Sequence, residues 1–161
     1  MVIEATDIEV GSSDIATVKA IIYTYPDGIE YEVASTEFEN GGFKLNLPAF
    51  VPKEYTWFIS EGLAKGIIVS DTQAKTGLIS AIEAYNSAGE FVGLFVLKND
   101  EWFVGYWYTD RNFTQKGTAE YGVKFDCSLK KGWNVVYSHN EKTTTKKPAN
   151  ELFKWYYMPS Y

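Results

Sequence analysis

The sequence contains only one cysteine, Cys127, and one histidine, His139, among its 161 residues. A single cysteine excludes a disulfide within the chain, and the two residues cannot supply the ligands of a structural zinc site. No apolar run approaches the roughly 18 residues that a membrane-spanning helix requires. We therefore expect a domain with no transmembrane segment, held together by an ordinary hydrophobic core.

The motifs of common catalytic sites are also missing, since no G-x-S-x-G, P-loop, G-x-G-x-x-G or H-E-x-x-H pattern occurs. Ser138 precedes His139, but neighbours in a strand point to opposite faces and cannot form a dyad. With 21 acids, some carboxylate pair will always suit glycoside hydrolysis, so that pattern has no specificity. The oxygen-rich segments 99–101 and 110–112 lack the spacing of a calcium loop. The sequence predicts no enzyme activity, no cofactor and no bound metal.

Positive charge is scarce in the first part of the chain. Residues 1–62 carry 11 acids and three lysines, and residues 63–161 carry 10 acids and 12 bases, so −8 and +2 give the net charge of −6. An acidic half repels phosphate and removes the main source of nucleic-acid affinity. The lysine-rich stretch 141–147 (EKTTTKK) is typical of a solvated loop. We expect no nucleic-acid partner.

The dominant pattern is a period-two alternation of apolar and polar residues, interrupted by Gly, Asn and Asp. Val18, Ala20 and Ile22, for example, share one face of a strand and place Lys19 on the other. Seven or more short strands at spacings near ten residues predict an all-β fold. We expect an antiparallel β-sandwich with Greek-key and meander elements in a single domain, 1–161, with a closed β-barrel as the alternative.

The second half reads as a meander that begins near Gly77. A two-residue hairpin loop at Asn99-Asp100 would place Leu97 opposite Trp102. Cys127 falls on the alternating face of a strand and is expected to be a buried thiol. The segment 49–66 shows no period and is predicted to be a long connection. The expected strands are 77–86, 90–98, 101–109, 118–130, 132–139 and 151–158.

The sequence pattern of the segment 72–87 is compatible with a strand and with a helix. Leu78, Ile82 and Tyr85 also recur at helical spacing, and Gly89 could end a helix. Gly77 interrupts the helical pattern, and the segment that follows is a strand. We therefore favour a strand here and keep the helix as the alternative.

Aromatic residues stand out from the rest of the composition, at 17% of the chain. They concentrate in 102–108 (WFVGYWY) and 153–157 (FKWYY). Tyrosines and tryptophans on a sheet face can stack on sugars or anchor an interface. We select Trp102, Tyr106 and Tyr108 as the exposed, ligand-binding face, because tyrosine hydroxyls need partners. Substituting Trp102 or Tyr106 with alanine would then abolish binding without lowering the melting temperature.

The alternative for these rings is a core on both faces, because central strands of a sandwich are often covered twice. Arg111 is the only arginine, and it follows Asp110 in the loop directly after the aromatic strand. Its guanidinium could clamp a carboxylate or stack on a ring, and we add it to the candidate binding residues. A local ion pair with Asp110 is the alternative for this side chain.

Two parts of the chain resemble known families. Residues 33–48 (VASTEFENGGFKLNLP) resemble the strand-turn-strand of transthyretin-like, carboxypeptidase-regulatory-type modules. This resemblance implies an alternative division into a small module, 1–66, and a meander module, 67–161. The stretches 79–89 (ISAIEAYNSAG), 108–117 (YTDRNFTQKG) and 129–137 (LKKGWNVVY) resemble small secreted lipoproteins of unknown function from gut anaerobes. That resemblance implies an all-β fold and export to the cell surface or periplasm, with a lipid anchor outside these residues.

Together these features predict a non-catalytic, extracytoplasmic binding module that recognises glycan through surface aromatic rings. The alternative is a structural or assembly subunit that uses the same aromatic face against a surface protein. A hydrolase that uses two carboxylates is the third possibility.

Overall fold

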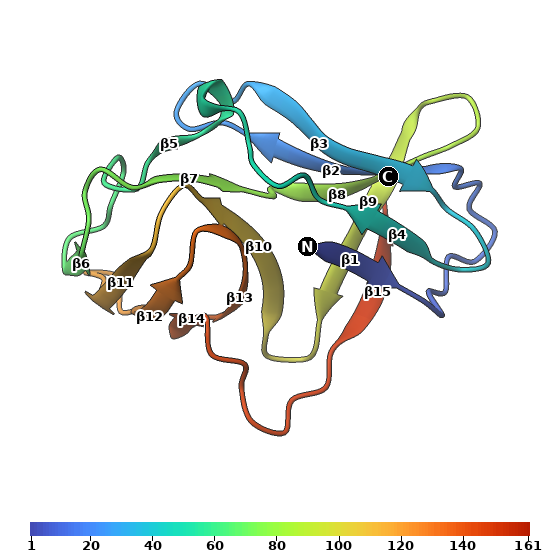
Figure 1. Ribbon diagram of the computed structural model, residues 1–161. Coiled ribbons are helices and arrows are strands. Elements are labelled where there is room, and N and C mark those ends of the chain that lie inside the picture. Colours follow the sequence, from blue (N-terminus) through green and yellow to red (C-terminus); the bar gives the residue numbers. More distant parts are fainter.

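The computed structural model describes residues 1–161 and contains fifteen β-strands and one short 3₁₀ helix (Figure 1). The all-β prediction is confirmed, and no helix is long or apolar enough to cross a membrane. The elements are β1 (Val2–Ala5), β2 (Thr17–Tyr23), β3 (Glu30–Glu37), β4 (Phe43–Asn46), η1 (Lys53–Tyr55), β5 (Trp57–Phe58), β6 (Ile67–Val69), β7 (Lys75–Leu78), β8 (Ala81–Tyr85), β9 (Phe91–Lys98), β10 (Phe103–Thr109), β11 (Phe113–Thr118), β12 (Lys124–Leu129), β13 (Gly132–His139), β14 (Lys142–Thr144) and β15 (Lys154–Pro159).

The strands form a large sheet of 13 strands and a small sheet of two, β1 and β4. The main path of the large sheet runs β3-β2-β8-β9-β10-β13-β14-β12-β11-β6, with β15 paired to β9 and with β7 joining β5 to β10. This path has two free ends, so the strands do not close into a barrel, and the sandwich prediction is confirmed. Neighbouring strands are antiparallel except β12 and β14, which are parallel.

The larger core lies between the small sheet and the inner face of the large sheet. Val18, Ala20 and Ile22 of β2 point into it and are fully buried, as their alternation predicts. Ile3 of β1 and Leu45 of β4 meet them from the small sheet. Each such Ile or Leu contributes about 1.5–3 kcal/mol by its burial. This core joins residues from β1 to β10, and so from both sides of the boundary at residue 66.

A second, smaller core lies on the other side of β10. Successive side chains of a strand point to opposite faces, so Tyr106 and Tyr108 enter the larger core while Trp107 packs against the smaller one. Cys127 of β12 belongs to the smaller core and is completely buried, as predicted. Burial raises the pKa of this thiol to about 11. Strand β10 is therefore covered on both faces, and Cys127 stays protonated at neutral pH.

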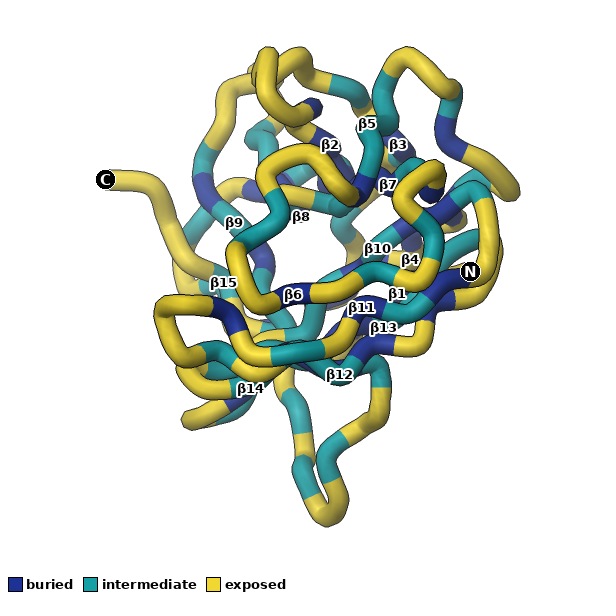
Figure 2. Tube along the Cα trace, turned by 90° about the vertical axis from the view of Figure 1, so that its left-hand side faces the viewer, coloured by how far each residue is buried: buried dark blue, intermediate teal, exposed yellow.

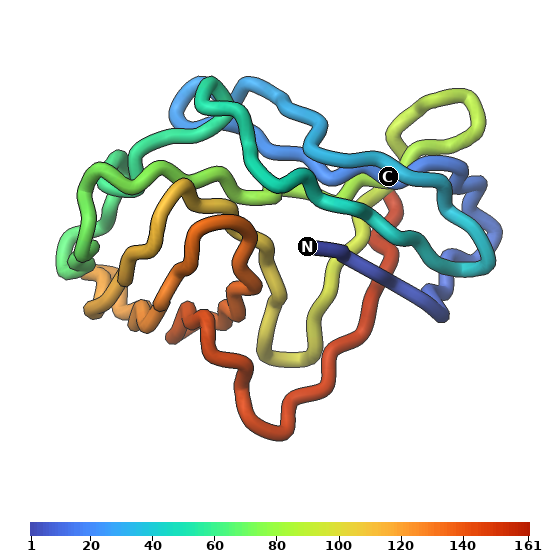
Figure 3. Tube along the Cα trace, viewed as in Figure 1, coloured from blue at the N-terminus to red at the C-terminus, as the bar shows by residue number.

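The hairpin of β9 and β10 is wider than predicted. Its last ladder pair is Phe103 with Lys98, and the backbone N–H of Asn99 donates to the carbonyl of Trp102. The predicted pairing of Leu97 with Trp102 is wrong, because four residues rather than two make the loop. Beyond the loop the two strands separate, as the trace in Figure 3 shows. There β9 pairs with β8 and β15, and β10 pairs with β7 and β13.

Several predicted boundaries differ from the structure. The segment 72–87 forms strands rather than a helix, as predicted, but they are two, β7 and β8, and residues 72 and 73 form a turn before them. The predicted strand 118–130 is wrong in its first part, because residues 119–123 form the turn between β11 and β12, with Gly122 at a φ of +93°. The predicted solvated loop 141–147 is also wrong in part, since Thr143 and Thr144 are buried in β14.

Two tyrosines donate hydrogen bonds to one buried carboxylate on the outer face of the large sheet. The hydroxyls of Tyr23 and Tyr85 donate to the two oxygens of Glu83 at 2.9 and 2.6 Å. The bond to Glu83, followed by burial, raises the pKa of Tyr23 to about 12. Burial and the same carboxylate raise the pKa of Tyr85. Both hydroxyls are therefore held in the neutral form in the folded state.

We expect this pair to make the protein sensitive to alkaline pH. Unfolded tyrosine ionises near pH 10, so the stability from these hydroxyls is complete below pH 10 and is lost as pH rises through the folded pKa of about 12. Urea midpoints measured at pH 8, 10 and 11 should fall in that order. The double variant Tyr23→Phe/Tyr85→Phe should flatten the decline, whereas Tyr161→Phe, at the exposed C-terminus, should not. Equal slopes for all three proteins would contradict this expectation.

Candidate functional site

The structure buries three of the four predicted site residues. Trp102, Tyr106 and Tyr108 keep 8%, 8% and 6% of their surface exposed, whereas 45% of the Arg111 side chain is exposed. The prediction that the first three rings form a solvent-facing surface is therefore wrong. The two core clusters cover both faces of β10, which is the alternative considered above.

Trp102 has a structural environment in the loop before β10. Its ring meets the imidazole of His139 edge-on, with centroids 4.1 Å apart and planes at 85°. Its backbone N–H donates to Oδ1 of Asn99 at 2.7 Å. His139 itself accepts at Nδ1 from the backbone N–H of Glu141. These contacts separate Trp102 from the other three predicted residues.

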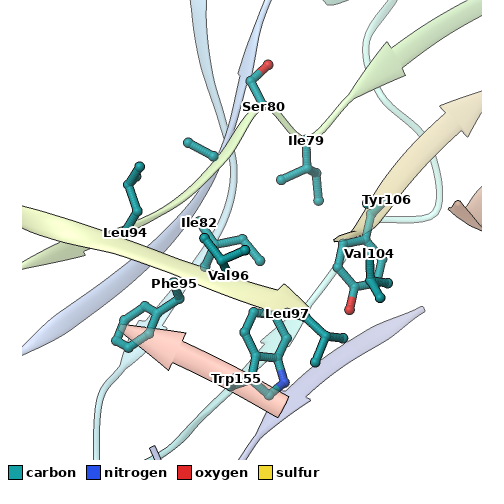
Figure 4. A pocket seen from close by; sticks show the side chains of 12 residues that line it. Ile79, Ser80, Ile82, Leu94, Phe95, Val96, Leu97, Val104, Tyr106 and Trp155 are labelled. Carbon is teal, nitrogen blue, oxygen red and sulfur yellow. The ribbon is translucent and has the colours of Figure 1, made fainter. Parts of the chain in front are cut away.

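Tyr106 lines a small cavity where β9 and β10 separate. Side chains from β8, β9, β10 and β15 surround it, and ten of its 12 lining residues are hydrophobic (Figure 4). Its volume is 140 Å³, comparable to apolar cavities that hold a benzene-sized molecule. Burial raises the pKa of Tyr106 to about 12, so its hydroxyl stays protonated. This cavity is too small for an oligosaccharide.

Tyr108 and Arg111 lie together in a larger pocket of 510 Å³, which we call the Arg111 pocket. Phe58 of β5 adds a second ring, and Lys53 of η1 and Lys75 of β7 add two cations. The Lys75 ammonium lies over the Phe58 ring, 4.8 Å from its centroid. Of the four predicted residues, the structure thus brings two to one site.

The local pair between Arg111 and Asp110 forms in the structure. Nε and Nη2 of Arg111 donate to the two carboxylate oxygens of Asp110, each at 3.1 Å. Nη1 lies 3.5 Å from a carboxylate oxygen of Asp71. Partial burial alone would raise the pKa of Asp110, but hydrogen bonds from Arg111 and from the backbone N–H of Lys75 hold it below its usual value. The guanidinium therefore has a fixed orientation at the pocket.

A third pocket, of 320 Å³, lies on the opposite face of the same strands. Trp57 of β5 stands opposite Thr76 of β7, and Leu78 of β7 stands opposite Trp107 of β10, so Trp57, Leu78 and Trp107 share this face. Strands β6, β11 and β12, which face the viewer in Figure 2, supply the other wall. We call it the Trp57–Trp107 pocket. Its aromatic lining residues are Tyr25, Trp57, Trp107, Tyr121 and Phe125.

Gln115 of β11 places an unsatisfied polar group at this pocket. The residue is only 5% exposed and lines the pocket, and its Oε1 is the only buried side-chain oxygen or nitrogen in the protein without a hydrogen-bond partner. Leaving such an acceptor unpaired costs about 1–3 kcal/mol of stability. A ligand that donates a hydrogen bond to Gln115 would recover that cost.

The mouth of the Trp57–Trp107 pocket is formed by exposed rings. Tyr25 and Tyr121 are 49% and 63% exposed, and Glu61 supplies one carboxylate beside them. Gly62 lets the Tyr25 ring lie close to this segment, because a Cβ there would stand 2.8 Å from the Tyr25 hydroxyl oxygen. The floor is buried and the rim is open, an arrangement that suits a small polar ligand with apolar faces.

Sequence reasoning did not identify this pocket. Trp57 lies in the segment 49–66, which has no period, and Gln115 lies outside every predicted strand. Trp107 belongs to the aromatic run, but on the face that was not selected. The available signal was the pair of adjacent rings at Trp57-Phe58 and again at Trp107-Tyr108, because such pairs place one ring on each face of a strand.

No group of three or more His, Cys, Asp or Glu side chains is arranged to hold a metal ion. No protein-family model, curated protein or solved structure matches the chain. The geometry of the Arg111 pocket and of the Trp57–Trp107 pocket is therefore the basis for a functional proposal.

Proposed function

We propose that this chain is a non-catalytic binding module that holds a glycan in the Trp57–Trp107 pocket. An extracytoplasmic location belongs to the same proposal, and the resemblance of its second half to small secreted lipoproteins supports it. The buried, unpaired Oε1 of Gln115 in an aromatic-lined pocket is the observation that carries the proposal.

The shape and lining of the pocket suit a sugar ring. The faces of indole and phenol rings stack on the apolar C–H faces of pyranoses. The hydroxyl groups of the sugar donate hydrogen bonds and therefore need acceptors. Gln115, whose Oε1 has no partner in the protein, and Glu61 both line the pocket and carry such acceptors. The volume of 320 Å³ lies in the range of small-ligand sites. One ligand class therefore satisfies both the apolar and the polar part of the lining.

The chemistry of the pocket favours binding over hydrolysis. Glycoside hydrolysis generally requires two carboxyl groups on either side of the bond, and Glu61 is the only acid among the lining residues. Serine, threonine, cysteine and histidine are absent from the lining. The protein's one imidazole, His139, packs against Trp102 elsewhere in the fold.

The test is calorimetric titration with a panel of neutral oligosaccharides. We expect one class to bind, and Trp57→Ala to weaken that binding about tenfold or more by removing a stacking surface. Phe58→Ala is the matched control, because this neighbouring ring points to the opposite face and should leave neutral-glycan affinity unchanged. Equal losses in the two variants, or no binding across the panel, would contradict the proposal.

Gln115→Leu should separate binding from stability. Leucine removes an unpaired buried acceptor, so we expect the free energy of unfolding to rise by about 1 kcal/mol while glycan affinity falls about tenfold. Urea unfolding and the same titration measure the two quantities. Asn46→Leu, at an exposed position of β4 outside both pockets, should change neither. A less stable Gln115→Leu protein would mean that this amide has a stabilising partner in solution.

The alternative of an assembly subunit is favoured by a different surface from the one predicted. Tyr156 and Met158 of β15 stand opposite Val96 and Leu94 of β9, on the outer face of the large sheet. They are 42% and 50% exposed, and Phe103 of β10 beside them is 53% exposed. Sedimentation analysis of the purified protein, with Met158→Lys as the disrupting variant, tests whether this face self-associates.

A further inference from the structure

The Arg111 pocket concentrates positive charge in an acidic protein. Three bases, Lys53, Lys75 and Arg111, and one acid, Asp110, line it, which gives a charge of +2. Including Asp71, which contacts Arg111 from outside the lining, leaves +1. The whole chain carries −6, the Trp57–Trp107 pocket has Glu61 as its one charged lining residue, and the cavity at Tyr106 has none. The pocket beside His139 contains Asp100, Glu101 and Glu141 and no lysine or arginine.

The three cations of this pocket keep hydrogen-bond donors that no group of the protein accepts. Arg111 directs Nε and one N–H of Nη2 to Asp110, and Nη1 lies 3.5 Å from Asp71, so one N–H of Nη1 and one of Nη2 remain for an anion. Lys75 rests over the Phe58 ring, and Lys53 has no ion pair within the protein. A fixed guanidinium beside two ammonium groups is the arrangement that carboxylates and sulfates bind.

The pocket also contains apolar surface on which a ring can rest. Phe58 and Tyr108 line its wall, and Phe50 at its rim is 66% exposed. Phe58 and Tyr108 are the immediate neighbours of Trp57 and Trp107, so the Arg111 pocket and the Trp57–Trp107 pocket lie back to back. The strands between them are β5, β7 and β10, which Figure 1 shows side by side. The two pockets open on opposite faces, and the Arg111 pocket is the larger, the more polar and the positively charged one.

We propose that the Arg111 pocket is a second sugar-binding site, one that selects an anionic group, carboxylate or sulfate, on an acidic oligosaccharide. This inference rests on the proposed glycan-binding function for its choice of ligand, but on different residues. A neutral sugar and an acidic sugar would then bind at separate sites, and one acidic polysaccharide could bridge two copies of the module.

Calorimetric titration with tetragalacturonate and with its methyl ester tests the charge requirement, since the two share one backbone. We expect tetragalacturonate to bind at least about tenfold more tightly than its methyl ester, and added salt to weaken the binding of tetragalacturonate alone. The double variant Lys53→Met/Lys75→Met keeps the apolar part of both side chains and should weaken the binding of tetragalacturonate about tenfold. The double variant Lys146→Met/Lys147→Met, which removes two exposed lysines outside the pocket lining, is the matched control. A sulfated galactan tetrasaccharide, titrated in parallel, shows which anion is preferred.

The outcomes separate this inference from the proposed function. If Lys53→Met/Lys75→Met weakens the binding of tetragalacturonate and Trp57→Ala does not, the anionic site is supported even where no neutral oligosaccharide binds. If only Trp57→Ala weakens the binding of tetragalacturonate, the Trp57–Trp107 pocket binds this ligand and the inference is overturned. Equal affinity for acid and ester, an unchanged lysine variant, or binding of neither probe also overturns it.

Discussion

Tyr106→Ala is expected to lower the free energy of unfolding by about 3–5 kcal/mol. The ring is 8% exposed, belongs to the larger core and borders the 140 Å³ cavity at the separation of β9 and β10. Truncation would enlarge a cavity that already exists, and the paired strands around it cannot close to fill the space. For a protein of this size we expect the melting temperature to fall on the order of 10 °C.

Phe103→Ala supplies the comparison within the same strand. Phe103 is 53% exposed, and its ring contacts the ammonium of Lys98 at 5.8 Å from the ring centroid. We expect a change within about 0.5 kcal/mol, as for other exposed positions. Chemical unfolding of both variants distinguishes a buried aromatic from an exposed one. A stable Tyr106→Ala protein would restore the first expectation that this face of β10 meets solvent.

The contrast between these two residues shows where sequence reasoning reached its limit. Alternation correctly predicted the β2 core residues, the extended segment before residue 86 and the burial of Cys127. In β10, however, both faces are apolar, so alternation cannot say which face is covered. The coverage comes from β1 and β4 on one side and from β11 and β12 on the other, and these contacts are distant in sequence.

The candidate pocket was beyond prediction for a related reason. It joins Tyr25, Trp57, Trp107 and Gln115, which lie on four separate segments. Two-residue β5 and three-residue β6 are too short to show a period. Their positions depend on pairing with β7 and β11, and only that pairing brings the rings together. Arg111 was found because it is the only arginine, a compositional signal that needs no topology.

The second large effect is expected at Gly66, where β6 meets β11. A Cβ at Gly66 would stand 2.1 Å from the carbonyl oxygen of Thr118, and a Cβ at Gly117 would stand 2.2 Å from the carbonyl oxygen of Gly66. Gly66 also has a φ of +95°, which side chains rarely adopt. Gly66→Ala therefore combines backbone strain with the loss of the β6–β11 ladder. We expect it to lower the free energy of unfolding, measured in urea, by about 3 kcal/mol or more.

Gly132→Ala measures the cost of the backbone strain without the steric clash of the added Cβ. Gly132 has a φ of +99°, nearly that of Gly66, but no atom lies within 4 Å of its Cβ position. We expect this control to cost about 1–3 kcal/mol, from backbone conformation alone. If Gly66→Ala cost no more than the control, the close approach of β6 to β11 would not be a structural requirement.

The Gly66 experiment also connects the fold to the proposed site. Ile67 follows Gly66, is 8% exposed and lines the Trp57–Trp107 pocket opposite the two indoles. Displacing β6 would open that wall and expose Gln115, whose unpaired oxygen would then gain water instead of a ligand. Gly66→Ala should therefore lose neutral-glycan affinity at temperatures where it remains folded, whereas Gly132→Ala should retain it. Because the substitution removes no group that could touch a ligand, such a loss would mean that β6 and β11 must stay paired for the pocket to bind.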